Sequence, residues 1–166
     1  AITYLKRVNP DALAPEQRYE LFYTLGYSYF SKRKLAEAAP LFDRLKISNN
    51  PYRYAASYYA GYIAYEQDRY DAALQDLQRA GESDAYRSKV SLMIATIYYR
   101  QGRNEELLAY AEKELNGRRS GREQQELALL TAEAYFSQEQ YPQALTYYER
   151  YMAFMRKLPE PAILHK

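Results

Sequence analysis

The chain has 166 residues, of which 48% are hydrophobic and 27% charged, a balance that predicts a folded protein. Its formal charge of +2, from 23 basic and 21 acidic residues, gives no general attraction to nucleic acid or to an anionic membrane. The chain has no cysteine, which excludes disulfides and thiolate metal sites, and no apolar run approaches the ~18 residues that a membrane span requires.

Residues 1–18 are predicted to be the end of a preceding repeat and a connecting loop. The segment AITYLKRV is apolar-periodic but has no helix-start signal, and Asn9 and Pro10 close it. It also lacks the organisation of a signal peptide. We expect the chain to be a piece of a longer protein, because a repeat array needs polar caps and neither end offers one.

The rest of the chain repeats one spacing of small residues. Three pairs lie 12 residues apart, Gly26 with Ala38, Gly61 with Ala73, and Ala132 with Ala144, and Ala95 is followed at the same distance by Leu107. The residues that open these four units are separated by 35, 34 and 37 positions. A period near 34 is typical of helix-turn-helix repeats.

Each unit is predicted to contain two helices joined by a short turn. The segments GYSYF, GYIAY, ATIYY and AEAYF lie in the first helices, and AEAAPLF, DAALQDL, EELLAYA and PQALTYY lie in the second. The quartets SKRK, EQDR and SQEQ, together with Gly102, supply the turns. The predicted units are 19–53, 54–87, 88–124 with an extended basic loop, and 125–158, followed by the start of a further helix at 159–166 in the same continuous domain.

This pattern resembles the tetratricopeptide repeat (TPR) from about Tyr19 to Met155. The residues that carry the resemblance are Leu25, Gly26, Tyr29, Ala38, Phe42, Pro51, Gly61, Tyr70, Ala73, Ala80, Ala132, Tyr135, Tyr141, Ala144 and Tyr148. The resemblance implies an all-α fold, a right-handed α-solenoid of helix-turn-helix repeats. The third unit departs from the pattern at Leu107, Ala111 and Glu114, so we expect its second helix to be shifted or loosely packed.

Glycine inside a helix costs ~1 kcal/mol relative to alanine, so Gly26 and Gly61 need a reason. Facing helices approach closely where both contribute small side chains. We therefore expect Gly26 to face Ala38 and Gly61 to face Ala73. Pro40 is expected early in a second helix, where it removes few intrahelical hydrogen bonds.

The 21 tyrosines of the chain, against five phenylalanines, help to form two stripes along the first helices. The stripe that contains the small residue is predicted to be core: Phe22, Gly26, Tyr29, Ser57, Gly61, Ala64, Ser91, Ala95, Tyr98, Ala128, Ala132 and Tyr135. The TPR resemblance implies that the second stripe, one residue over, faces a concave groove. Its candidate binding residues are Tyr23, Tyr27, Tyr58, Tyr62, Tyr65, Lys89, Thr96, Tyr99 and Glu133.

Two interpretations of this second stripe stay open. Its aromatic residues can pack between adjacent first helices, or they can bind a peptide or protein segment, since tyrosine offers wide contact area at low entropic cost. Some TPR domains hold a C-terminal carboxylate with lysine and asparagine at these places. Here tyrosine replaces them at Tyr23, Tyr27 and Tyr58, which favours an extended or helical segment of unknown identity.

Two other functions are compatible with the sequence. The array can be purely architectural, assembling larger complexes through its ends and convex face. Tyrosine-rich arrays resemble those of bacterial envelope assembly proteins, which suggests the periplasm or the outer membrane as a hypothesis for location. Helical repeats can also read RNA, but the aromatic stripe and the low net charge argue against nucleic acid, although tyrosine could stack on bases.

No catalytic, cofactor or metal signature was found, so we predict a protein that is not an enzyme and binds no cofactor. His165 is the only histidine and Glu105-Glu106 is expected to be a solvated helix start. The loop NGRRSGRE, with Arg118, Arg119 and Arg122, is interpreted as a solvated linker rather than a phosphate site.

Overall fold

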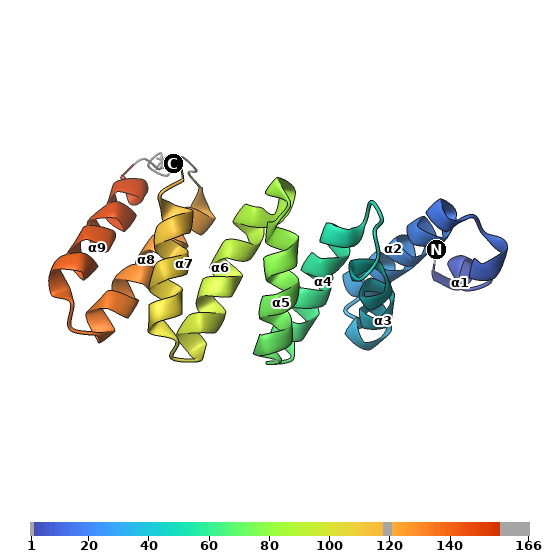
Figure 1. The fold of residues 1–166 in the computed structure, drawn as a ribbon, viewed down its shortest axis with the longest axis horizontal. Helices are drawn as coiled ribbons and strands as arrows, with labels where there is room; N and C mark the ends of the chain where they lie inside the picture. Colours follow the sequence, from blue (N-terminus) through green and yellow to red (C-terminus); the bar gives the residue numbers. More distant parts are fainter. Residues whose placement is uncertain (1, 118–120, 157–166) are drawn as a thin grey trace, which may run out of the picture. The chain divides into compact units, whose positions relative to one another are not determined.

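The computed structural model describes residues 2–117 and 121–156, and helix is the regular secondary structure found in these ranges (Figure 1). Its elements are α1 (Ile2–Leu5), the short 3-10 helix η1 (Pro10–Ala12), α2 (Pro15–Ser31), α3 (Leu35–Lys46), α4 (Arg53–Glu66), α5 (Tyr70–Gly81), α6 (Asp84–Arg100), α7 (Asn104–Leu115), α8 (Arg122–Ser137) and α9 (Tyr141–Met155). The all-α prediction is confirmed. The helix start expected at 159–166 lies outside the described residues.

The turns inside the four helix pairs share one backbone geometry. Each contains a residue with positive φ: Arg33 (59°), Asp68 (56°), Gly102 (67°) and Glu139 (60°). The amide of the following residue donates to the carbonyl five residues earlier, as Lys34 does to Tyr29 at 2.9 Å. Such a Schellman cap satisfies carbonyls at the helix end and stops the helix. These four turns follow the same 35-, 34- and 37-residue separations as the small residues of the sequence.

The chain forms two compact units, and the boundary between them falls inside α6. The N-terminal unit is Ala1–Val90 and the C-terminal unit is Ser91–Lys166. In the N-terminal unit, α4 contacts both its own partner α5 and the preceding helix α3. Ala56, Ala60 and Ile63 supply the face of α4 that packs on the α2–α3 core, because their spacing places them on one side of the helix.

The close approach of α4 and α5 requires Gly61. A Cβ on Gly61 would lie 2.8 Å from Cγ of Leu77 and 3.1 Å from its backbone nitrogen. A Cβ on Gly26 would lie 3.1 Å from the Phe42 ring. The expected facing residues therefore need correction: the nearest atoms belong to residues one turn beyond Ala73 and Ala38. Long helical side chains lean toward the helix N-terminus, so the residue one turn later covers the glycine.

The predicted core stripe is confirmed with one exception. All of its members are buried except Phe22, which is half-buried. Pro40 lies inside α3 beyond its first turn, where its missing amide hydrogen removes a single intrahelical hydrogen bond.

The second helix of the third unit is well packed, contrary to our expectation. Leu107 and Ala111 of α7 are 0% exposed and Leu115 is 1% exposed. In the same C-terminal unit, the Tyr135 hydroxyl of α8 donates to Glu112 of α7, and Arg150 of α9 donates to the Leu115 carbonyl. Leu107 stands where the other three units have alanine, and its larger side chain is fully buried.

Candidate functional site

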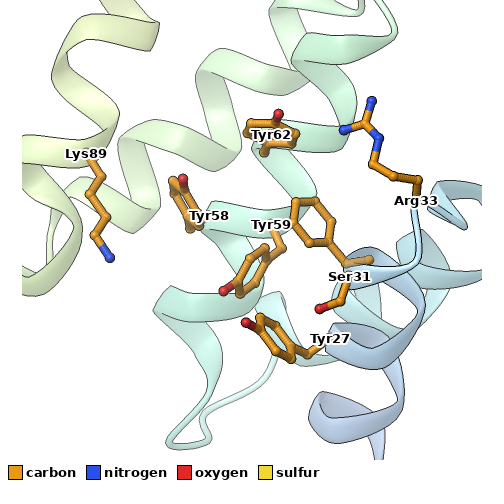
Figure 2. A pocket seen from close by; sticks show the side chains of 8 residues that line it. Tyr27, Ser31, Arg33, Tyr58, Tyr59, Tyr62 and Lys89 are labelled. Atoms are coloured by element: carbon orange, nitrogen blue, oxygen red, sulfur yellow. The ribbon is translucent and has the colours of Figure 1, made fainter. Parts of the chain in front are cut away.

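The N-terminal unit contains a pocket of about 380 Å³ (Figure 2). It is lined by the second-stripe residues of α2 and α4, by the turn after α2 and by the start of α6. The lining residues are Tyr27, Phe30, Ser31, Arg33, Tyr58, Tyr59, Tyr62 and Lys89. Aromatic walls with a few polar groups are typical of binding sites, although the volume is near the lower end for a drug-sized ligand.

Tyr59 lies at the centre of an aromatic network. Its ring stacks on the buried Phe42, with centroids 5.0 Å apart and planes 21° apart. Phe30 and Tyr27 approach it with centroids 4.8 and 5.6 Å away. One face of the Tyr59 ring is therefore already covered by the core residue Phe42. Figure 2 shows the hydroxyls of Tyr27 and Tyr59 pointing to the same side of the pocket.

A second group of rings supports the first. Tyr23 stacks on Tyr52, with centroids 4.6 Å apart, and the ring of Tyr58 lies 5.4 Å from that of Tyr86. Burial raises the pKa of Tyr23, Tyr58 and Tyr86 above the ordinary value of 10.0. The pKa of Tyr59 is raised for the same reason. These hydroxyls stay neutral near pH 7 and can donate or accept hydrogen bonds.

Two cations reach the pocket, and they differ in their partners. Arg33 forms an ion pair with Glu66, whose carboxylate lies 2.9 Å from the guanidinium. The Lys89 ammonium lies 5.5 Å from the centroid of the Tyr86 ring, a cation–π distance. Lys89 itself is exposed. Of the two charges, the one on Arg33 is already neutralised.

Comparison with known proteins gives a family match within the N-terminal unit. The sequence profile of the tetratricopeptide repeat matches residues 23–88, which include most of the pocket. This part of the chain matches the tetratricopeptide repeat family. No curated protein sequence gives a significant match to the chain.

Solved TPR-like structures share the fold at low sequence identity. A crystal structure of MamA is 18% identical with a TM-score of 0.76, covering 94% of this chain and 87% of that chain. MamA from AMB-1 is 17% identical with a TM-score of 0.76, covering 99% and 87%. Kinesin light chain TPR-like repeats from Podosopora anserina are 17% identical with a TM-score of 0.69, covering 96% and 88%. These similarities confirm the predicted fold class, a helical-repeat solenoid.

The structure brings together four of the nine predicted site residues. Tyr27, Tyr58, Tyr62 and Lys89 line the pocket. Tyr23 lies beside it, and its ring is 6.3 Å from that of Tyr27. The second stripe is neither fully packed nor fully free, because Tyr27 is 47% exposed while its neighbours on the pocket wall are half-buried.

The other predicted site residues are not among the pocket lining. The ring of Tyr65 lies 6.2 Å from that of Tyr70. Thr96, Tyr99 and Glu133 belong to the C-terminal unit. Thr96 donates its hydroxyl hydrogen to the Leu92 carbonyl at 2.7 Å, and Tyr99 and Glu133 are exposed. Their role in binding stays a prediction.

Sequence reasoning missed Tyr59, Ser31 and Arg33 as parts of the pocket. The second stripe includes Tyr58, so its sequence neighbour Tyr59 was not predicted to line the site. A signal was present: Tyr52 and Tyr59 are seven residues apart, which places them on one helix face beside Ala56 and Ile63. Ser31 and Arg33 have no comparable periodic signal, since they lie at a helix end and in a turn.

The described residues contain neither a candidate metal site nor a candidate membrane-spanning helix. They contain no group of three or more histidine, cysteine, aspartate or glutamate side chains that could hold a metal ion. No helix among them has the length and apolar character to cross a membrane. Arg118, Arg119 and His165 lie outside the described residues, as does the centre of the predicted basic loop.

Proposed function

We propose that this protein is an interaction scaffold whose tyrosine-lined pocket in the N-terminal unit binds a segment of a partner protein. The observation that supports this most directly is the pocket of about 380 Å³, walled by five aromatic side chains and reached by two cations. Tyrosine presents both apolar area and a polar hydroxyl, and it is enriched at the centres of protein interfaces. Tyr65, Thr96, Tyr99 and Glu133 remain proposed contacts along the second stripe.

The arrangement of the rings supports a peptide over RNA as the ligand. Single-stranded nucleic acid binds through bases stacked on open aromatic faces and through several phosphate contacts. Here a face of Tyr59 is covered by Phe42, and Tyr58 and Tyr86 lie against each other. Ring edges and hydroxyls remain, and these suit the amides and carbonyls of a polypeptide.

A selection from a phage-displayed library of random peptides, with the whole chain as bait, tests the proposal. Enriched peptides are synthesised with a fluorescent label, and their Kd is measured by polarisation. We expect Tyr27→Ala to weaken binding by about tenfold, the typical loss at an interface centre. Because Tyr27 is 47% exposed, we expect the variant to fold as the wild type does, and its melting temperature checks this.

Tyr141→Ala is the matched control, because Tyr141 is 55% exposed on α9 and does not line the pocket. It should leave Kd unchanged. Equal Kd values for wild type and Tyr27→Ala, or no enriched peptide, would reject the proposal. Preferential binding of single-stranded RNA to the same chain, lost in Tyr27→Ala, would favour the RNA-reading alternative instead.

A second candidate function, assembly of copies through α9, is supported by the apolar residues of this helix. Five apolar residues of this helix follow a spacing of 4, 3, 4 and 3 and so form one stripe. They are Tyr141, Leu145, Tyr148, Met152 and Met155. All except the half-buried Tyr148 are between 44% and 58% exposed.

The position equivalent to Tyr148 in the first repeat is Phe42, which is 0% exposed beneath α4. The α9 face thus matches a surface that another first helix covers elsewhere in the chain, and a second copy carries such helices. Light scattering after size exclusion tests this: wild type should show a concentration-dependent dimer, and Leu145→Glu with Met152→Glu should be monomeric. A wild-type monomer at all concentrations would exclude self-assembly through α9.

A further inference from the structure

Lys89 is the cation of the pocket that has no carboxylate beside it. None of the pocket-lining residues is acidic, and within the described part of the chain Lys89 forms no ion pair. Arg33, in contrast, has Glu66 at 2.9 Å. Among the described residues, Lys89 is therefore the pocket cation without an ion pair, and an anionic ligand group would find its partner there.

The surroundings of Lys89 hold its ammonium near the aromatic wall. Tyr86 lies beneath the ammonium at 5.5 Å, and the Tyr86 ring in turn lies 5.4 Å from Tyr58. Figure 2 shows the Lys89 side chain extending from its helix toward the side of the pocket where Tyr58 and Tyr59 lie. A charge in this position is accessible to a ligand and still adjacent to apolar surface.

The remaining lining offers apolar area from α2 and α4, together with tyrosine hydroxyls. Phe30 and the ring edges of Tyr27 and Tyr62 can take an aliphatic or aromatic side chain. The hydroxyl of Tyr58 stays protonated near neutral pH, since burial raises its pKa. It can donate to a carbonyl or carboxylate oxygen without bringing a charge of its own, whereas the Tyr59 hydroxyl is hydrogen-bonded to Tyr23.

We propose that the pocket selects a protein segment in which a side-chain carboxylate lies close to a large apolar side chain. The carboxylate pairs with Lys89, and the apolar side chain enters the hollow between Tyr27, Phe30 and Tyr62. This inference rests on the proposed function, since it names the chemistry of the segment that the same pocket binds. A nucleic acid fits less well, because a single uncompensated cation neutralises few phosphates.

The experiment uses a labelled peptide from the library selection that contains one glutamate, and the same peptide with glutamine. Both have an amidated C-terminus, so that a terminal carboxylate cannot supply the charge. We expect Lys89→Met to weaken the glutamate peptide about three- to fivefold, the size of a solvent-exposed ion pair, and to leave the glutamine peptide unchanged. Lys89→Glu should reverse the preference, so that the glutamine peptide binds more tightly.

Lys113→Glu is the control for net charge, because Lys113 is exposed on α7 and does not line the pocket. It should keep the preference of the wild type. The inference is wrong if enriched peptides carry no excess of aspartate or glutamate, or if Lys89→Glu leaves the preference intact while Tyr27→Ala still weakens binding. Restored affinity on freeing the C-terminus of the glutamine peptide would assign the carboxylate to the chain end instead. Loss of all peptide binding to the wild type rejects the proposed function itself.

Discussion

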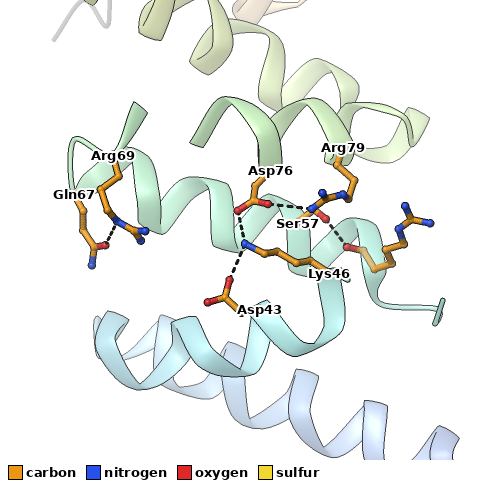
Figure 3. Close-up of polar contacts among 8 residues, drawn as sticks. Asp43, Lys46, Ser57, Gln67, Arg69, Asp76 and Arg79 are labelled. Atoms are coloured by element: carbon orange, nitrogen blue, oxygen red, sulfur yellow. Dashed lines mark hydrogen bonds and ion pairs between the residues drawn. The ribbon is translucent and has the colours of Figure 1, made fainter. Parts of the chain in front are cut away.

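Nζ of Lys46 lies 2.7 Å from the carboxylate of Asp76 and joins α3 to α5, the second helices of two consecutive repeats (Figure 3). Arg79 contacts the other oxygen of Asp76 at 3.1 Å. Asp43 also lies 2.7 Å from Lys46, but its side chain is 56% exposed whereas that of Asp76 is 5% exposed. Two carboxylates that share Lys46 thus differ in burial, and Asp76 has Arg79 as a second partner.

This difference predicts unequal effects of removing the two charges. Asp76→Asn should lower the free energy of unfolding by about 1.5–3 kcal/mol, because a buried charged hydrogen-bond acceptor is lost. Asp43→Asn should cost less than about 1 kcal/mol, because solvent screens its ion pair. Urea denaturation measures both values. Equal losses would show that burial does not govern this network.

Gly61 and Gly26 are predicted to respond differently to alanine. Gly61→Ala should lower the free energy of unfolding by about 1–3 kcal/mol, because the new Cβ would overlap both the side chain and the backbone of Leu77. Gly26→Ala should change it by less than about 1 kcal/mol, since the Phe42 ring can shift and helix propensity improves. Thermal unfolding of both variants measures the difference. A larger loss for Gly26→Ala would contradict the assignment of the closest approach to α4 and α5.

The left-handed turn residues allow a test of backbone strain alone. Gly102 has φ of +67°, and a Cβ there would meet nothing within 4 Å. Gly102→Ala should therefore cost about 1 kcal/mol through the backbone conformation and not through packing. Glu139→Gly, at the equivalent turn of the fourth pair, should gain about 0.5 kcal/mol, the strain relieved minus the added entropy of the unfolded chain. Chemical denaturation should therefore show a lower free energy of unfolding for Gly102→Ala and a higher one for Glu139→Gly.

The buried tyrosines predict a loss of stability at alkaline pH. Burial raises the pKa of Tyr58, Tyr59 and Tyr135 above 10.0, the value expected in the unfolded chain. A group whose pKa is raised on folding stabilises the fold fully below its unfolded pKa, and this contribution disappears as the pH rises through the folded pKa. We therefore expect unfolding above pH 10, with phenolate absorbance rising together with the loss of helical circular dichroism.

Tyr59→Phe separates this effect from general alkaline damage. The variant has no hydroxyl to ionise at the centre of the network, so its alkaline unfolding should begin at a higher pH than that of the wild type. Tyr141→Phe, on the exposed part of α9, should not move the transition. An unchanged transition in Tyr59→Phe would mean that other groups cause the alkaline unfolding.

The fold could be predicted well because a repeated pattern gives independent copies of each signal. Gly26, Gly61, Ala95 and Ala132 recur at a helix-turn-helix period, and the structure buries all four. The residues closest to Gly26 and Gly61 were predicted one turn too early, at Ala38 and Ala73. Spacing along the chain identifies which helices face each other, but the lean of the side chains decides which atoms touch.

The candidate site could be predicted only in part. Helical periodicity found Tyr27, Tyr58 and Tyr62, because residues at that spacing share one helix face. It did not find Arg33, which reaches the pocket from a turn, nor the difference between Arg33 and Lys89. Whether a charge is compensated depends on Glu66, which is 33 residues from Arg33 and is brought near it by packing of the two repeats.

The sequence by itself determined the class of the fold, the repeat period and the face of each first helix that becomes core, because these follow from local spacing and apolar pattern. Only the tertiary structure decided which tyrosine faces are covered. Tyr59 and Phe42 come from different repeats, and their stacking depends on how α4 lies on α3. Ring contacts of this kind depend on side-chain directions across two helices, which no spacing along one chain specifies.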